Sequence, residues 1–231
     1  MIKAALIDMD GVLYDSMPGH VQVWCEVMAS YGVDCKPEDI YLLEGRTGFS
    51  VVNVLYKRMF GHDASPEKQK EIYEKKCLKF AELGNTNPMP GVLEVLKKVK
   101  EYGIMPLIVT GSGQYSLFED LEVNFPGFFK KELMVTAYDV TMGKPHPEPY
   151  LTGLKKAGVK ASDAIVIENA PLGIESAKAA GIYTVAVNTG PLPDEVLFEA
   201  GADCVYSNMQ RLADDFENII HPPAPLKGEP N

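Results

Sequence analysis

A short apolar run near the N-terminus, Ala4 to Ile7, is followed by two aspartates, Asp8 and Asp10, and then by Gly11. An uninterrupted apolar run of this length is typical of a strand buried on both faces, as in the parallel sheet of an α/β protein. Side chains two residues apart on an extended chain point to the same side, so we expect the two carboxylates to share one small site. Neighbouring anions favour a hard cation or a shared proton; the alternative is a solvated Asp-Gly turn.

The composition is ordinary for a soluble globular protein. With 231 residues, 46% hydrophobic and 23% charged, the chain is long enough for one large or two small domains. The formal net charge of −10 argues against nucleic acids and anionic membranes as partners. The four cysteines form no CxxC pair, which predicts inert thiols. No signal peptide or membrane-spanning run is recognisable, so we expect a cytoplasmic protein, most simply a monomer.

The spacing of apolar residues divides the chain into a helical part and an alternating part. Helical periodicity dominates from residue 16 to about residue 86, and strands alternate with helices from residue 92 onward. This alternation predicts a doubly wound, parallel, Rossmann-like α/β sheet with an inserted all-helical cap. The predicted units are an α/β core (1–15 and 88–221), a helical cap domain (16–87) and a disordered tail (222–231). The later strands are expected at 104–109, 133–136, 164–167, 183–187 and 204–206.

Polar side chains follow several of these predicted strands. They are Thr110 and Ser112 after 104–109, Lys144 in the loop after 133–136, and Glu168 with Asn169 after 164–167. Each alone is also compatible with a plain strand end, a surface loop or a helix cap. Because the carboxyl ends of parallel strands share one edge, we expect all of them to meet the two aspartates. Oxygen ligands, a lysine, hydroxyls and a free carboxylate together favour Mg²⁺-assisted phosphoryl transfer.

With these motifs the chain resembles the haloacid dehalogenase superfamily of phosphotransferases, over about residues 2–216. The resemblance implies that Asp8 is the nucleophile, which forms an aspartyl-phosphate, and that Asp10 is the general acid and base. Thr110 and Lys144 would orient the phosphate and balance its charge. A Mg²⁺ cofactor would be held by Asp8, the Asp10 backbone carbonyl and the acidic fourth motif, Glu168-Asn169. The helical insert resembles the mobile cap of the family.

Within the superfamily, the chain is most similar to the β-phosphoglucomutase-like subfamily. His20, near the start of the first cap helix, and Lys76, on a later cap helix, are expected to contact the substrate. The same expectation applies to Arg46 in the cap loop and to Gly111 and Ser112 in the loop after strand 104–109. The alternative for His20 is a surface or hinge residue.

Two residues depart from the mutase pattern. Asn169 stands where the usual motif has a second acid, which removes one negative charge from the predicted metal site. Glu44, before Gly45, stands where a mutase would offer a basic or neutral residue. A cap acid that closes over the core would repel a phosphate unless it met Mg²⁺, so Glu44 is a further candidate ligand. Glu44 and Asn169 together resemble a pyrophosphatase of this superfamily; the alternative for Glu44 is a solvated loop acid.

The sequence therefore predicts a Mg²⁺-dependent phosphohydrolase that acts on a small phosphorylated substrate, with inorganic pyrophosphate as the first candidate. The closest rival is a β-phosphoglucomutase, and a sugar-phosphate phosphatase lies between them. A non-catalytic module is the alternative from another class, but the intact set of Asp8, Asp10, Thr110 and Lys144 argues against it.

Overall fold

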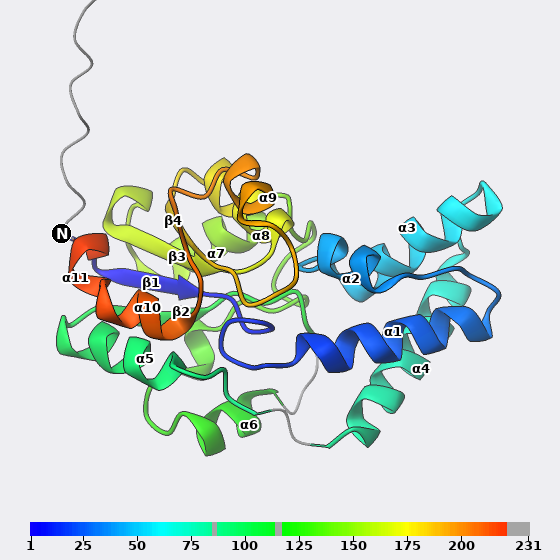
Figure 1. Cartoon of the computed structure of the whole chain (residues 1–231), viewed down its shortest axis with the longest axis horizontal. Coiled ribbons are helices and arrows are strands. Elements are labelled where there is room, and N and C mark those ends of the chain that lie inside the picture. Colours follow the sequence, from blue (N-terminus) through cyan, green and yellow to red (C-terminus); the bar gives the residue numbers. More distant parts are fainter. Residues whose placement is uncertain (85–86, 114–116, 221–231) are drawn as a thin grey trace, which may run out of the picture.

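Five parallel strands form one sheet in the computed structural model, which describes residues 1–84, 87–113 and 117–220. The strands are β1 (Ala4–Ile7), β2 (Met105–Ile108), β3 (Ala164–Glu168), β4 (Tyr183–Val187) and β5 (Cys204–Tyr206). Their order is β2-β1-β3-β4-β5, with every neighbouring pair parallel (Figure 1). Ile7 lies opposite both Ile108 and Ile167, so the residues that follow these three positions lie at one level along the strands. The predicted α/β fold is confirmed.

Strand β1 is buried on both faces because helices cover both sides of the sheet. Ala5 and Ile7 pack into one hydrophobic cluster, and Ala4 and Leu6 pack into another. The first cluster involves α5 (Val92–Glu101), α6 (Leu117–Asn124), α10 (Met209–Asp214) and α11 (Phe216–Ile220). The second involves α7 (Glu148–Ala157) and α8 (Pro171–Ala179). Helix α9 (Asp194–Glu199) packs near β5, and a 3₁₀ turn, η2 (Ala161–Asp163), precedes β3.

Four helices lie between β1 and α5 and form what we call the helical insert. They are α1 (Met17–Ser30), α2 (Pro37–Leu43), α3 (Gly48–Phe60) and α4 (Pro66–Glu82). They enclose a hydrophobic cluster of their own, with Trp24, Val52 and Ile72 among its buried members. The helical insert projects beyond the carboxyl ends of the strands, away from the N-terminal edge of the sheet (Figure 1). That residues 16–87 form a separate, mobile domain stays a prediction.

The two connections to the helical insert run side by side. The Asp15 amide donates to the Asn87 carbonyl at 3.0 Å, and the Met89 amide donates to the Leu13 carbonyl at 2.8 Å. Tyr14 and Pro88 form an isolated antiparallel bridge between these contacts. A paired crossing of this kind is where a rotation of the helical insert would have to occur.

The prediction of a strand at 133–136 is wrong. A 3₁₀ turn, η1 (Lys131–Leu133), ends at the first residue of this segment. Within the segment, Val135 alone forms an isolated bridge, to Val109 beside the end of β2. The Thr136 amide donates to the Asp139 carboxylate at 2.9 Å, so it is not available for further pairing. The predicted tail, 222–231, lies outside the described residues.

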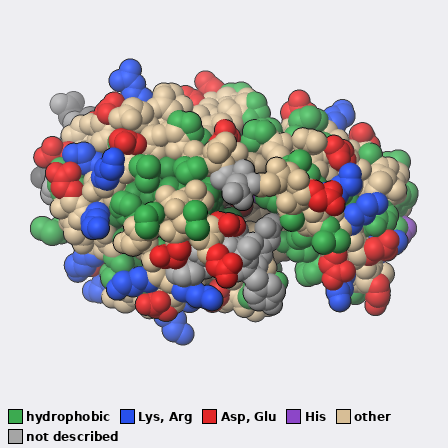
Figure 2. All heavy atoms as spheres, turned by 90° about the horizontal axis from the view of Figure 1, so that it is seen from below, with side chains coloured by type: hydrophobic (Ala, Val, Ile, Leu, Met, Phe, Trp, Pro, Cys, Tyr) green, Lys and Arg blue, Asp and Glu red, His purple; other side chains and the backbone are tan. Residues whose placement is uncertain are grey.

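Surface charge is mixed on the face that Figure 2 displays, where Lys and Arg are interspersed with Asp and Glu. No helix among the described residues is long and apolar enough to cross a membrane.

Candidate active site

A cavity of about 80 Å³ lies between the carboxyl edge of the sheet and the helical insert. The predicted site residues that line it are Asp8, Asp10, His20, Glu44, Arg46, Lys76, Thr110, Gly111 and Ser112. The first two follow β1 and the last three follow β2, whereas the others come from the helical insert. The structure thus brings together residues that lie up to 104 positions apart in sequence, because the carboxyl ends of β1 and β2 are level.

Behind the cavity, Lys144 joins two buried carboxylates in what we call the lysine cluster (Asp8, Lys144 and Glu168). The Lys144 Nζ donates to Asp8 Oδ1 at 2.5 Å, to Glu168 Oε1 at 2.6 Å and to the Val109 carbonyl at 3.1 Å. All three charged residues are buried. A lysine ammonium has three protons, so every one is paired. The cluster therefore sets one lysine against two buried carboxyl groups.

Glu168 lies among four donors and does not line the cavity. Its Oε1 accepts from Lys144 and, at 2.7 Å, from the Tyr150 hydroxyl. Its Oε2 accepts from the backbone amides of Asn169 and Ala170 at 3.0 and 3.2 Å. This geometry differs from the expected metal-ligand role, because the side chain at the end of β3 is directed at Lys144.

Asp10 makes its contacts with the helical insert in what we call the histidine cluster (Asp10, His20 and Lys76). Asp10 Oδ1 accepts from the Ser16 hydroxyl at 2.6 Å and lies 3.0 Å from His20 Nε2. Lys76 Nζ lies 2.8 Å from His20 Nδ1. If the lysine donates to Nδ1, the ring proton lies on Nε2 and points to Asp10. His20 also stacks on Phe80, with ring centroids 4.0 Å apart.

The pKa values of the two aspartates are displaced in opposite directions. Burial raises the pKa of Asp8 to about 8, because Lys144 offsets only part of the desolvation and Glu168 adds repulsion. Burial also opposes ionisation of Asp10, yet His20, Ser16 and Lys76 together lower its pKa to about 2. Asp8 therefore needs further positive charge to be an anion at neutral pH, whereas Asp10 is already one.

Glu44 and Asn169 meet across the junction between the helical insert and the sheet. The Asn169 side-chain amide donates to Glu44 Oε1 at 2.8 Å, and a Cβ added to Gly11 would lie 2.1 Å from the same amide nitrogen. Burial raises the pKa of Glu44 well above its usual range, and the nearby Asp8 raises it further. Glu44 is thus a half-buried acid at the site.

The donor set around Asn169 fits the Mg²⁺ that the sequence resemblance implies. Asn169 Oδ1 is buried and has no hydrogen-bond partner among the described residues. The carboxylates of Asp8, Asp10 and Glu44 line the cavity beside it. Oxygen donors with an excess of negative charge are what a hard divalent cation requires. No cluster of three or more His, Cys, Asp and Glu placed to hold a metal was found in the described part of the chain, so such a site depends on the asparagine.

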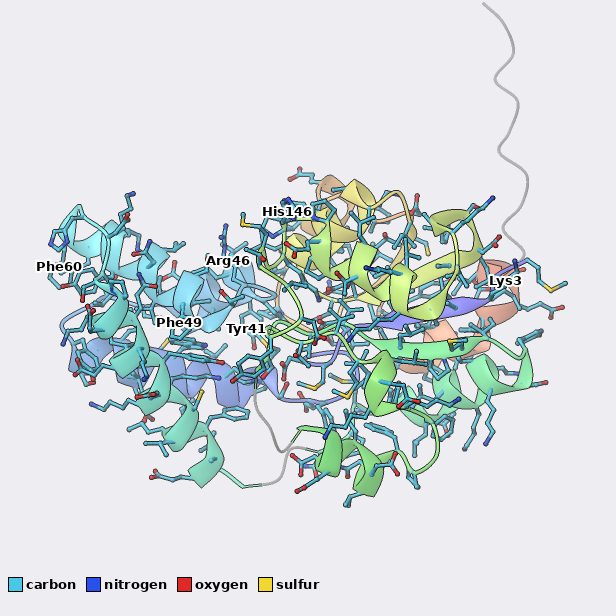
Figure 3. The ribbon with its side chains drawn as sticks, turned by 180° about the vertical axis from the view of Figure 1, so that it is seen from behind. Lys3, Tyr41, Arg46, Phe49, Phe60 and His146 are labelled. Atoms are coloured by element: carbon cyan, nitrogen blue, oxygen red, sulfur yellow. The ribbon has the colours of Figure 1, made fainter. Side chains whose placement is uncertain are left out.

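The loop after α2 packs directly onto the core. An added Cβ on Gly111 would lie 2.7 Å from the Gly45 carbonyl oxygen, and one on Gly45 would lie 3.1 Å from the Lys144 side chain. The close backbone approach requires glycine at Gly111, and Gly45 has a φ of 89°, a conformation that other residues rarely adopt. Arg46 lies at this junction, as does His146 from the facing loop, whereas Phe60 lies at the far end of the helical insert (Figure 3). The Arg46 Nη1 donates to Ser50 at 3.2 Å, and its buried Nε has no partner in the described structure.

A model of haloacid dehalogenase-like hydrolases matches residues 5–187. The chain belongs to this family. The matched residues run from β1 to the end of β4 and include every predicted site residue.

Two similar proteins are named as phosphatases, and one similar solved structure is named as a putative mutase. The chain is 33% identical to a "Phosphorylated carbohydrates phosphatase" of Thermotoga maritima, with 87% of this chain and 92% of the relative covered. It is 30% identical to "Hexitol phosphatase A" of Escherichia coli, with 80% and 83% covered. A solved structure, "Putative beta-phosphoglucomutase from Bacteroides vulgatus", is 49% identical with a TM-score of 0.91, and the match covers 94% of this chain and 88% of that one. None of these three is described as a pyrophosphatase.

Sequence reasoning missed two residues that contact the predicted ones. Ser16 occupies the N-cap position of α1, but its hydroxyl donates to Asp10 and makes no capping bond. Tyr150, in α7, is fully buried and holds Glu168. The alternation of side chains along β3 could have indicated the Tyr150 contact. Ala164 and Val166 lie in the same hydrophobic cluster as Tyr150, and Glu168, two residues after Val166, points to the same side of the strand.

Proposed function

We propose that the protein is a Mg²⁺-dependent phosphohydrolase that acts through an aspartyl-phosphate on Asp8. The observation that carries this proposal is the Asp8–Lys144 contact of 2.5 Å at the wall of the cavity. It presents a carboxylate to the cavity and holds a cation beside it. This is the arrangement that nucleophilic catalysis on a phosphate requires, because the attacking anion and the phosphate oxygens both need a positive neighbour.

The chemistry divides into two displacements. In the first, an Asp8 carboxylate oxygen attacks phosphorus and the bond to the leaving oxygen breaks. In the second, water attacks the same phosphorus and the bond to Asp8 Oδ breaks, which releases phosphate. Asp10, two residues on, is the group for proton transfer: it gives a proton to the leaving oxygen in the first step and accepts one from the attacking water in the second. Its low pKa keeps it ionised, and so able to accept a proton, in the substrate-free site. Thr110, which lines the cavity, would orient the phosphate oxygens, and Lys144 would balance charge from behind Asp8.

Mg²⁺ would be held by Asp8, the backbone carbonyl of Asp10, Asn169 and Glu44, and it would supply charge neutralisation at the phosphate. We leave Glu168 out of this set, because Lys144, Tyr150 and two backbone amides already use its carboxylate. Without added positive charge, burial disfavours the anionic form of Asp8, so a cation at this place suits the nucleophile.

Inorganic pyrophosphate is our first candidate substrate. One feature supports it: Glu44 reaches Asn169, so this acid stands beside the candidate metal donors, where it would leave less room for a bulky leaving group than a small side chain would. The phosphate that leaves from pyrophosphate is smaller than a hexose.

A sugar-phosphate phosphatase or mutase is the second candidate. The names of the Thermotoga maritima and Escherichia coli relatives favour a carbohydrate or polyol phosphate, and the Bacteroides vulgatus structure favours a mutase. His20 and Lys76 line the cavity and could hydrogen-bond a polyol. A larger substrate would require the helical insert to stand further from the sheet.

Phosphate release from pyrophosphate, glucose 6-phosphate, sorbitol 6-phosphate and β-glucose 1-phosphate distinguishes these candidates. Each is assayed with Mg²⁺ and with a chelator, and β-glucose 1-phosphate is also assayed with a bisphosphate primer for glucose 6-phosphate formation. Mg²⁺-dependent release with a preference for pyrophosphate supports the first candidate. A preference for a sugar phosphate, or isomerisation, supports the second. No Mg²⁺-dependent turnover of any of them contradicts the phosphohydrolase.

A further inference from the structure

Lys144 has to remain in place while its partner Asp8 changes chemical form. In the structure Asp8 Oδ1, Glu168 Oε1 and the Val109 carbonyl accept its three protons. Once Asp8 carries a phosphoryl group, one of these acceptors is altered. The position of Lys144 then depends on the two that remain, and only Glu168 is charged.

Glu168 is itself fixed by groups on both of its oxygens. The amides of Asn169 and Ala170 hold Oε2, so that side of the carboxylate is tied to the start of α8. The Tyr150 hydroxyl, 2.7 Å from Oε1, is the other donor on the oxygen that Lys144 uses. Burial raises the pKa of Tyr150 well above its ordinary value, so the hydroxyl keeps its proton and donates.

Tyr150 acts on no substrate atom. It is fully buried, it does not line the cavity, and the Lys144 ammonium lies 5.1 Å from its ring centroid. The ring therefore packs beneath the lysine while the hydroxyl reaches Glu168. A phenylalanine would keep the ring and its attraction for the cation, and would remove only the hydroxyl.

We infer that Tyr150 is a positioning residue, which holds Glu168 so that Lys144 stays beside Asp8 through both displacements. The inference rests on the proposed role of Asp8. Without the hydroxyl, Glu168 Oε1 has Lys144 as its remaining donor, so the carboxylate turns toward the lysine and draws it away from Asp8. The loss falls on the contact between Asp8 and Lys144 and not on the cavity residues of the helical insert.

The test compares Tyr150→Phe with Tyr206→Phe. Tyr206 is a matched control, because its hydroxyl also donates to a carboxylate, Asp215 Oδ2 at 2.6 Å, and neither residue lines the cavity. The measurements are kcat, KM and the half-activating Mg²⁺ concentration, with the best substrate of the panel above, and thermal unfolding of each variant. Tyr150→Phe is expected to lower kcat about 10-fold, the effect of one hydrogen bond to a charged group, with KM and the Mg²⁺ requirement changed less than about twofold. Tyr206→Phe is expected to keep the wild-type kcat.

A double-mutant cycle with Glu168→Gln separates positioning through Glu168 from a general packing effect. If Tyr150 acts through Glu168, the double variant is no slower than Glu168→Gln alone. Independent multiplication of the two losses overturns the inference. So does a Tyr150→Phe variant that matches Tyr206→Phe in kcat, or one whose loss is restored by excess Mg²⁺, because Tyr150 would then serve a metal ligand.

Crystal structures of the wild type and Tyr150→Phe provide a readout that does not depend on turnover. The expected change is a Lys144 Nζ to Asp8 Oδ1 separation that grows beyond hydrogen-bond distance, about 3.5 Å. If the lysine cluster is unchanged in Tyr150→Phe, the inference is overturned, even where kcat has fallen. If no substrate is turned over, the proposed function fails, and the crystal structures still decide whether Tyr150 positions Lys144.

Discussion

The lysine cluster and the histidine cluster both place a carboxylate at the same cavity, but they differ in where their partners come from. Asp8, Lys144 and Glu168 all belong to the sheet-bearing part, with side chains that are 7%, 1% and 1% exposed. Asp10 instead takes its partner His20 from the helical insert, and these side chains are 21% and 12% exposed. The first cluster is complete without the helical insert, whereas the second exists only with the helical insert docked as in this structure.

This difference separates two tasks at one site. The lysine cluster holds its groups in fixed, fully paired positions, which suits the bond-making step. The histidine cluster and the Glu44–Asn169 contact join the helical insert to the sheet-bearing part. Both contacts therefore depend on the size of the substrate that lies between these two parts. We therefore expect changes in the lysine cluster to affect every substrate alike, and changes at the junction to affect substrates unequally.

The largest expected effect is that of Asp8→Asn. The amide cannot attack phosphorus, so turnover of every substrate should fall by at least about 10⁴-fold. Lys144 keeps Glu168 and the Val109 carbonyl as partners, so the protein should remain folded. Phosphate release together with the circular dichroism spectrum and the unfolding midpoint checks both parts. Substantial residual activity in a folded variant would contradict the nucleophile assignment.

Asp10→Asn should have a smaller effect, because it removes proton transfer and leaves the nucleophile intact. The expected loss is about 10²–10⁴-fold in kcat, the range of general acid and base catalysis. The loss of kcat should also depend on the leaving group. Hydrolysis of esters with a poor alcohol leaving group should slow more than hydrolysis of p-nitrophenyl phosphate, because a poor leaving group needs the proton more. Equal losses for both would mean that Asp10 acts through the contact with His20 and not as an acid.

The sheet and the positions of the polar residues around it could be predicted from the sequence, because both follow from local patterns. Ile7, Ile108 and Ile167 end apolar runs, and parallel pairing brings those ends level. The prediction of a strand at 133–136 failed for a different reason. Its apolar pattern was present, but the Asp139 side chain, three residues on, accepts from the Thr136 amide, and such a local contact between a side chain and the backbone leaves no mark on apolar periodicity.

The direction of side chains was harder to predict than their position. Glu168 was placed correctly at the end of a strand, yet the sequence did not reveal that Tyr150 and Lys144 would occupy its carboxylate. Ser16 was ambiguous for a similar reason, because a serine at a helix start usually caps the helix. In both cases the partner that decides the role lies on another element, and its distance is fixed only by packing.

Glu44→Ala tests whether the junction discriminates between substrates. If Glu44 favours pyrophosphate as the substrate, the ratio of pyrophosphate hydrolysis to hexose 6-phosphate hydrolysis should fall about 10-fold in the variant. The substitution removes one oxygen ligand for Mg²⁺ and makes room for a larger leaving group. Glu38→Ala is the control, since Glu38 is an exposed acid on α2, the helix that leads to Glu44. An unchanged ratio for Glu44→Ala, or an equal change for Glu38→Ala, would remove the junction from substrate choice.

The smallest effect concerns stability, and it follows from the burial of Glu44. The pKa of Glu44 is higher in the folded protein than its unfolded value of 4.5. Between these two pKa values the folded state keeps a proton that the unfolded state has lost. The free energy of unfolding therefore falls as the pH rises from 4.5 through the folded pKa. With a chelator present, Glu44→Gln should therefore unfold at a higher temperature than the wild type at pH 7.5, and this advantage should vanish toward pH 4.5. A shift of about 2–4 °C corresponds to each kcal/mol for a chain of this size.

Added Mg²⁺ should narrow that gap by stabilising the wild type more than Glu44→Gln, since a ligand stabilises the state that binds it. Differential scanning fluorimetry across this pH range, with and without Mg²⁺, measures both trends. A gap that is independent of pH and Mg²⁺ would mean that Glu44 is solvated in solution. The junction would then lack the acid contact with Asn169 that joins the helical insert to the sheet-bearing part, which is what distinguishes it from the lysine cluster.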